Sequence, residues 1–220
     1  MTDVRAVEEL VVGVLGGTGP QGRGLAVRLA AAGQRVLLGS RDAERAEEVA
    51  AEVAGRAAAV AGDVEVSVTG GSNVDVAGAA DLVIIAVPYS GHADTLAELA
   101  TPLAGKVVVD CVVPMGWDEL GAYVLDVPEG SVAQQAAGLL PDSSVVGAFH
   151  HLSARLLEDL SRPTLDGDVM VVGDVREATD TVQALAGRLR NARQVEALTI
   201  NLVSVNRRYK AHAGIRVTDV

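Results

Sequence analysis

The chain has 220 residues, enough for one large domain or for one domain with a small second lobe. Its formal net charge of −11 argues against nucleic acid or an anionic membrane surface as a partner, and its longest apolar run, residues 82–88, is too short to span a bilayer. The single cysteine, Cys111, excludes an intrachain disulfide. Together with an acidic N-terminal segment that lacks an apolar signal core, it predicts a cytoplasmic protein.

Short β-branched runs alternate along the chain with alanine-rich stretches of helical period, which is the pattern of a parallel sheet with helices on both faces. The predicted elements are, in chain order, a strand at 10–15, a helix at 20–32, a strand at 34–39, a helix at 42–58, a weak strand at 66–69, a short helix or turn at 72–80, a buried strand at 81–87, a helix at 89–100, a strand at 106–112, a loop at 114–130, a helix at 131–140 and a strand at 144–148. The pattern changes after His150 and then predicts a strand at 169–172, a helix at 175–189, a short strand at 194–196 and a last apolar helix at 198–209. The chain is therefore expected to form an α/β, doubly wound parallel-sheet domain over residues 1–149 and a small C-terminal α/β lobe over residues 150–220.

A glycine-rich turn follows the first predicted strand, where residues 11–24 read VVGVLGGTGPQGRG. Within it, Gly17, Gly19 and Gly22 have the spacing GxGxxG, and the next residues begin a predicted helix. In a Rossmann domain the first glycine allows a tight turn, the second lets a pyrophosphate approach, and the third lets the helix pack on the strand. The helix N-terminus then supplies N–H donors to the phosphates. The turn, with Thr18, Pro20 and Gln21 inside it, is therefore a predicted dinucleotide site.

The tip of the second predicted strand indicates which dinucleotide binds. A site for NAD usually carries Asp or Glu here, but this chain has Ser40 and Arg41, with Arg45 one helical turn later. A hydroxyl and two guanidinium groups suit a 2′-phosphate, which predicts NADP(H) rather than NAD(H). The alternative is that both arginines lie on a solvated helix face, paired with Glu44, Glu47 and Glu48. Asp42 is expected either to cap that helix or to compete for the ribose.

The carboxyl ends of the later strands predict where a nicotinamide and a substrate would lie. Val87 and Pro88 would form an apolar wall beside the nicotinamide ribose, although Pro88 would equally end a strand. Tyr89 would stack on a ring or cap the sheet. His150, at the end of the sixth strand, is the candidate catalytic residue, placed to donate a hydrogen bond to a substrate carbonyl. Its alternative is a satisfied structural histidine.

The remaining chemistry-bearing residues are expected to be structural. His92 is interpreted as a surface or capping residue and His151 as structural, while Cys111 is expected in a buried apolar role because no base can be placed near it. The carboxylates form no convincing catalytic pair, and metal-ligand spacing is absent, so no metal site is expected.

Five blocks of sequence resemble the NADPH-dependent coenzyme F420 reductases, also called F420H2:NADP oxidoreductases. They are GGTGPQGRGLAVRLAAAGQRVLLGSRDAERA, IAVPYSGHADTL, VVDCVVP, GAFHHLSA and NRRYKAHAGIRVTD, in that order along most of the chain. The first block also fits ketopantoate or pyrroline-carboxylate reductases. The Gly-Ser-Arg tip, the histidine after the sixth strand and the C-terminal block are more specific.

The resemblance implies reversible hydride transfer between the nicotinamide of NADP(H) and the deazaflavin of coenzyme F420. Such an enzyme needs little side-chain chemistry, because the cofactors carry the reactivity and the protein holds two rings face to face. The implied NADP positions are Thr18, Gly19, Pro20, Gln21, Ser40, Arg41 and Arg45. The F420 side would use His150, Val112 and Arg207, with Arg208, Lys210 and Arg216 as further candidates for the acidic tail. The alternative for these cations is a basic turn that complements the dipole of the last helix.

Two other functions remain open from the residues alone. One is an NADPH-dependent reductase of another acceptor, such as a flavin, a ferric chelate or a small C=N or C=O substrate. The other is a non-catalytic NADP(H) sensor. A homodimer is also expected, because Leu139, Leu140 and the apolar last helix would extend a shared interface.

Overall fold

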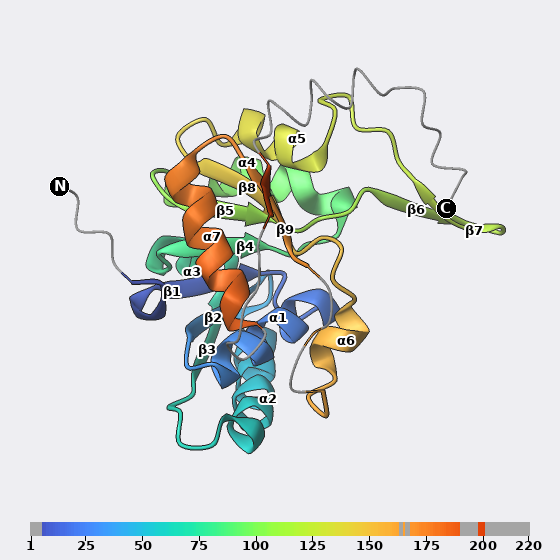
Figure 1. Ribbon diagram of the computed structural model, residues 1–220. Coiled ribbons are helices and arrows are strands. Elements are labelled where there is room, and N and C mark those ends of the chain that lie inside the picture. The colour runs from blue at the N-terminus through green and yellow to red at the C-terminus, as the bar shows by residue number, and fades with distance from the viewer. Residues whose placement is uncertain (1–5, 163–164, 166–167, 190–197, 201–220) are drawn as a thin grey trace.

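The computed structural model describes residues 6–162, 165, 168–189 and 198–200 (Figure 1). The strands are β1 (Val11–Leu15), β2 (Arg35–Ser40), β3 (Ser67–Ser72), β4 (Leu82–Ile85), β5 (Val107–Asp110), β6 (Met115–Asp118), β7 (Gly121–Val124), β8 (Ser144–Ala148), β9 (Met170–Gly173) and β10 (Leu198–Ile200). The helices are η1 (Val7–Glu9), α1 (Pro20–Ala31), α2 (Ala43–Ala61), α3 (Asn73–Ala79), η2 (Tyr89–Gly91), α4 (His92–Leu103), α5 (Val132–Leu139), α6 (Ala154–Glu158) and α7 (Arg176–Arg188).

Eight of these strands form one sheet in the order β10-β9-β8-β5-β4-β1-β2-β3. The six strands from β8 to β3 pair in parallel, whereas β9 pairs antiparallel with β8 and parallel with β10. The order of the parallel part reverses between β1 and β4, as it does in doubly wound dinucleotide-binding sheets. The predicted doubly wound α/β fold is therefore confirmed. The carboxyl ends of β1, β2, β4, β5 and β8 share one edge.

Helices cover both faces of the sheet (Figure 1), and each face carries its own cluster of buried apolar residues. Helices α1, α2, α6 and α7 bury side chains in one cluster with alternate residues of the strands, and Leu25, Val53 and Leu185 are examples. Helices α3, α4 and α5 build the second cluster, in which Val76, Leu99 and Ala136 pack on the opposite face. Within the described ranges, every helix is too short or too polar to cross a bilayer.

The prediction of a loop at 114–130 is wrong, because β6 and β7 form an antiparallel hairpin that projects from the body (Figure 1). The turn between them has a local cause: the carboxylate of Asp118 accepts a hydrogen bond from the N–H of Leu120 (2.8 Å), and Gly121 takes a φ of 118° that side chains disfavour. Apolar side chains on this hairpin are exposed, so its sequence lacks the one-sided alternation that reveals a half-buried strand.

The C-terminal part of the chain also differs from expectation. Residues 198–200, predicted to begin a helix, form β10 at the sheet edge, and the predicted strand at 194–196 lies outside the described residues. The short helix α6 was not predicted. Strand β9 continues the sheet of the N-terminal part, and the proposed division of roles at residues 149 and 150 stays a prediction.

Arg28 ties α6 to α1. Its side chain is buried, and its guanidinium donates to the carbonyl oxygens of Leu157 (2.8 Å), Leu156 (2.8 Å), Asp159 (2.8 Å) and Arg162 (3.1 Å). These carbonyls lie at the C-terminal end of α6 and just beyond it, where a helix lacks internal donors. Burial lowers the pKa of Arg28 and Asp159 raises it, so one buried cation serves four backbone acceptors.

Replacing Arg28 by Met is expected to lower the free energy of unfolding by about 3 kcal/mol or more, because buried carbonyls lose their charged donor. Urea unfolding followed by circular dichroism measures the loss. Arg176→Met is the control. Arg176 is an exposed arginine in an (i, i+4) ion pair with Asp180, and its change should stay within about 0.5 kcal/mol. Equal losses in the two variants would contradict the capping role of Arg28.

Candidate functional site

The glycine turn between β1 and α1 leaves no room for a side chain at Gly16, Gly17 or Gly22. The N–H of Gly17 donates to the carbonyl oxygen of Gly39 (3.1 Å), which ties the turn to β2. A Cβ on Gly22 would lie 2.7 Å from the carbonyl oxygen of Gly16 and 2.7 Å from the Cα of Gly17. Gly16 itself has a φ of 73°. Helix α1 starts directly after Gly19, so its free N–H groups open onto this turn, a geometry that fits a pyrophosphate.

A groove of about 490 Å³ runs from this turn across the ends of β2, β3 and β4, and we call it the dinucleotide groove. It is lined by Gly16, Thr18, Gly19, Pro20, Gln21, Ser40, Arg41, Asn73, Ala86, Val87, Pro88, Ser90, Gly91 and Thr95. The structure thus brings Thr18, Gly19, Pro20 and Gln21 of the predicted turn together with Ser40 and Arg41, and with Val87 and Pro88 from the far side. The predicted residues Gly17 and Gly22 are not among the residues that line the groove.

Two neighbours of Ser40 take simpler roles. Asp42 caps α2, because its carboxylate accepts a hydrogen bond from the N–H of Arg45 (3.1 Å). Its own N–H donates to the hydroxyl of Ser40 (3.2 Å). Arg45 is exposed and pairs with Glu48 (3.0 Å), and it is not among the residues that line the groove. The alternative of a solvated pair on α2 therefore describes Arg45 better than Arg41.

Asn73 is a lining residue that the sequence did not reveal. It begins α3 just after β3, and its Oδ1 is buried without a hydrogen-bond partner among the described residues. A buried acceptor without a donor is costly, so its place in the wall of a groove suits a polar ligand. No local motif marks it, since only the alignment of β3 beside β2 carries it to Ser40.

A second, smaller groove of about 220 Å³, the junction groove, continues from the first. It is lined by Gln21, Ala86, Val87, Pro88, Tyr89, Cys111, Val112, Val113 and His150. Four of these residues also line the dinucleotide groove, so the two hollows share walls. The predicted meeting of Val87, Pro88 and Tyr89 with His150 is present in the structure.

The glycine turn holds the backbone next to His150. The side-chain amide of Gln21 donates to the carbonyl oxygen of Phe149 (3.1 Å), and Phe149 is fully buried with a φ of 64° that only a constrained residue adopts. Burial lowers the pKa of His150 and its neighbour His151 lowers it further, although Asp110 raises it. A lowered pKa keeps the imidazole of His150 neutral at neutral pH, with one N–H donor and one acceptor.

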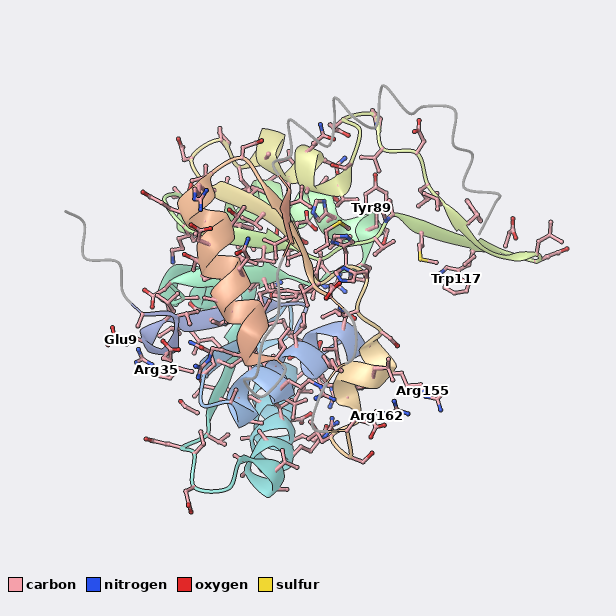
Figure 2. The ribbon with its side chains drawn as sticks, viewed as in Figure 1. Glu9, Arg35, Tyr89, Trp117, Arg155 and Arg162 are labelled. Atoms are coloured by element: carbon pink, nitrogen blue, oxygen red, sulfur yellow. The ribbon has the colours of Figure 1, made fainter. Side chains whose placement is uncertain are left out.

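A third hollow of about 690 Å³, the apolar pocket, lies on the other side of Val112, Val113 and His150. Its remaining walls come from Asp110, Pro114, Val124, Leu125, Asp126, Val127, Gly130, Ser131, Val132, Ala133, Gly147, Met170 and Val172. The hairpin base thus forms one wall of this pocket. In Figure 2, Tyr89 lies at the foot of the hairpin and Trp117 lies out along it. The volume and the mostly apolar lining suit a large flat ring system.

Cys111 belongs to the wall of the junction groove, and His92 lies behind Asp110, which lines the apolar pocket. The thiol of Cys111 donates to the carbonyl oxygen of Ile85 (3.1 Å), and burial raises its pKa far above the ordinary value, so it stays a protonated, buried side chain as expected. The interpretation of His92 as a surface or capping residue is wrong. His92 is fully buried and lies 2.8 Å from a carboxylate oxygen of Asp110. His151 contacts the carbonyl oxygen of Asp168 (3.0 Å), in keeping with a structural role.

Several predicted residues take no part in these hollows. Arg207 and the other C-terminal cations lie outside the described residues. Leu140 is buried in the core of its own chain and is not free for a shared interface, while Leu139 is partly buried against the same core. The described part of the chain contains no cluster of three His, Cys, Asp or Glu side chains suited to a metal ion.

The sheet order, the glycine turn and the groove across the strand ends define a dinucleotide-binding protein of the Rossmann class. The family model described as NADP oxidoreductase coenzyme F420-dependent matches residues 11–114. The F420-dependent NADP reductase of Methanothermobacter thermautotrophicus is 38% identical, with 95% of each chain covered. That of Methanocaldococcus jannaschii is 37% identical, over 95% of this chain and 98% of the relative.

A solved structure agrees with these sequence relatives. The crystal structure of a putative F420-dependent NADP-reductase from Arthrobacter sp. FB24 is 26% identical and superimposes with a TM-score of 0.66, covering 93% of this chain and 95% of that one. The chain belongs to the family of F420-dependent NADP oxidoreductases.

Proposed function

We propose that this protein transfers a hydride reversibly between NADP(H) and the deazaflavin of coenzyme F420. The observation that carries the proposal is the shared wall of the junction groove and the apolar pocket. Val112, Val113 and His150 border both hollows, so a nicotinamide in one and a large ring in the other would meet there. Membership in the family supports NADP(H) and coenzyme F420 as the two molecules.

The dinucleotide groove offers a donor for each part of NADP(H). Gly17, Gly19, Gly22 and the N-terminus of α1 would hold the pyrophosphate, with Thr18, Pro20 and Gln21 around it. Ser40 and Arg41, with Arg45 nearby, would bind the 2′-phosphate, because guanidinium groups form strong charge-assisted bonds to phosphate. Val87, Pro88 and Tyr89 would enclose the nicotinamide and its ribose.

The F420 side would use the apolar pocket. Val112 and His150, which line this pocket, would contact the deazaflavin. Arg207, outside the described residues, would bind the acidic tail, as the resemblance to the family implies. The two cofactors supply the chemistry, a hydride exchanged between nicotinamide C4 and deazaflavin C5. The protein aligns the rings and excludes water, and neutral His150 donates a hydrogen bond to an acceptor carbonyl. The protonated thiol of Cys111 offers no competing nucleophile.

The same proposal covers the roles of the two parts of the chain and the location of the enzyme in the cell. Residues 1–149 would bind NADP(H), residues 150–220 would complete the F420 cleft, and the protein would act in the cytoplasm, where the one cysteine stays reduced.

The first test mixes the purified protein with F420 and either NADPH or NADH. Loss of the visible absorbance of F420 with NADPH, and little loss with NADH, is the expected result. A free flavin, a ferric chelate and a cyclic imine serve as rival acceptors. Faster reduction of one of them than of F420 would show that F420 is not the substrate. Tight NADPH binding with no turnover of any acceptor would indicate a sensor instead.

Arg41→Ala is expected to lower the ratio of NADPH to NADH affinity by roughly tenfold to a hundredfold, because it removes a charged donor to the 2′-phosphate. Titration of protein fluorescence with each nucleotide measures the ratio. Arg35→Ala is the matched control, since Arg35 begins β2, whereas Arg41 follows its end, and Arg35 donates to the carbonyl oxygen of Glu9. An unchanged ratio in Arg41→Ala would contradict the proposal that Arg41 binds the 2′-phosphate.

We also propose a homodimer in which a second copy covers the β6–β7 hairpin. Trp117, Leu120 and Val124 are 74%, 98% and 71% exposed, and an isolated two-stranded hairpin is only marginally stable in water. Sedimentation equilibrium should give twice the chain mass for the native protein and a shift to monomer for Trp117→Ser with Leu120→Asp. A native protein that stays monomeric at micromolar concentration would contradict this assembly.

A further inference from the structure

A buried histidine–aspartate pair lies behind the wall that the junction groove and the apolar pocket share. His92 and Asp110 have side chains that are 0% and 1% exposed, and the Nε2 of His92 lies 2.8 Å from the Oδ2 of Asp110. Asp110 ends β5 and lines the apolar pocket, and Cys111 and Val112 after it line the junction groove. No part of the proposed hydride transfer assigns this pair a task.

The hydrogen bonds around the pair determine which of its atoms carry protons. The side-chain amide of Gln135 donates through Nε2 to the carboxylate of Glu129 (3.2 Å), so its Oε1 faces the Nδ1 of His92 at 3.1 Å. An amide oxygen only accepts, and Nδ1 must therefore carry a proton. A second proton lies between Nε2 and the carboxylate of Asp110. The pair thus holds two protons, and its net charge is zero.

The carboxylate of Asp110 has a further donor. Its Oδ1 accepts a hydrogen bond from the N–H of Val112 (2.9 Å), which favours the ionised carboxylate and leaves the second proton on His92. Among the described residues, His92 is the cation that pairs with the buried carboxylate of Asp110. A buried carboxylate without a counter-ion is strongly destabilising, so the imidazolium is needed at this position.

The field of Asp110 reaches the reaction site. Burial and His151 lower the pKa of His150, and Asp110 is the group that opposes them. The rings of Tyr89 and His92 also stack, with centroids 6.4 Å apart, so His92 supports a residue of the junction groove. The groups that face His92 are Asp110 and Gln135, with Tyr89 beside the ring and Glu129 behind Gln135.

We propose that His92 is the counter-ion of Asp110, so that the wall between the two hollows carries no net charge when an anionic acceptor binds and negative charge arrives with the hydride. The identity of the acceptor rests on the proposed function, whereas the charge pair itself does not. His92 is a positioning residue in this scheme: it acts through Asp110 and touches neither ring. Without it, an unpaired carboxylate would repel the acceptor and attract the cationic nicotinamide of NADP⁺.

The first experiment observes the pair in the ligand-free protein. Nitrogen-15 NMR of histidine-labelled protein at neutral pH should show both ring nitrogens of His92 protonated, with the signal assigned by its loss in His92→Gln. An unprotonated Nδ1 would overturn the proposal. This measurement needs neither F420 nor turnover, so it stands if the acceptor proves to be another molecule.

The second experiment uses binding, at alkaline pH where an unpaired carboxyl is ionised. His92→Gln should shift the ratio of NADP⁺ to NADPH affinity roughly tenfold toward NADP⁺ and weaken F420 binding about tenfold. The double variant His92→Gln with Asp110→Asn should restore both values, because it removes the unpaired charge. Arg176→Gln, at an exposed arginine of α7 that pairs with Asp180, is the control and should leave the ratio unchanged.

Opposite changes in the affinities for NADP⁺ and F420 cannot arise from loosened packing, because loosened packing lowers the affinity for every ligand. An equal loss of affinity for NADP⁺, NADPH and F420 in His92→Gln, unrelieved in the double variant, would show a packing role and overturn the proposal. If F420 does not bind the native protein, the proposed function fails, while the ratio for NADP⁺ and NADPH still decides the role of His92.

Discussion

The whole site depends on how closely the chain approaches itself after β1. Gly16 lies against β4, where an added Cβ would come within 2.7 Å of the carbonyl oxygen of Ala86, and Gly17 bonds the carbonyl oxygen of Gly39 on β2. The N–H of Ala86 in turn donates to Leu15 (2.9 Å). Because no side chain separates these backbones, the ends of β1, β2 and β4 meet at one point. The dinucleotide groove lies where they meet.

Helix α1 carries this constraint to the rest of the molecule. Gln21 in its first turn bonds the carbonyl oxygen of Phe149, and Arg23 pairs with Glu158 of α6 (3.0 Å). Arg28, further along, binds the C-terminal carbonyls of α6. One helix therefore fixes both the end of the groove at the glycine turn and the turn that presents His150. The residues that follow β8 are positioned relative to the glycine turn by polar contacts rather than by sheet pairing alone.

Features written in local sequence could be predicted, and features that depend on distant partners could not. The glycine turn and the tip of β2 are visible because each function resides in consecutive residues. His92 resembles an ordinary residue at the start of a helix. Its partners Asp110 and Gln135 are 18 and 43 residues away in sequence, so nothing near His92 reveals them. Asn73 is hidden for the same reason. The β6–β7 hairpin escaped because its apolar residues face outward, which removes the alternation that marks a strand against a core.

Burial shifts the pKa of two ionisable groups at the wall between the hollows, in opposite directions. It raises the pKa of Cys111, which keeps the thiol protonated, and it lowers the pKa of His150, which keeps the imidazole neutral. Asp110 alone has strong donors on both oxygens, from Val112 and His92, and these can hold its charge inside the protein. A wall with no nucleophile, no free acid and no net charge contributes little chemistry of its own. That is the environment in which two bound rings exchange a hydride without competition from the protein, and it explains why this family member needs precise walls more than reactive side chains.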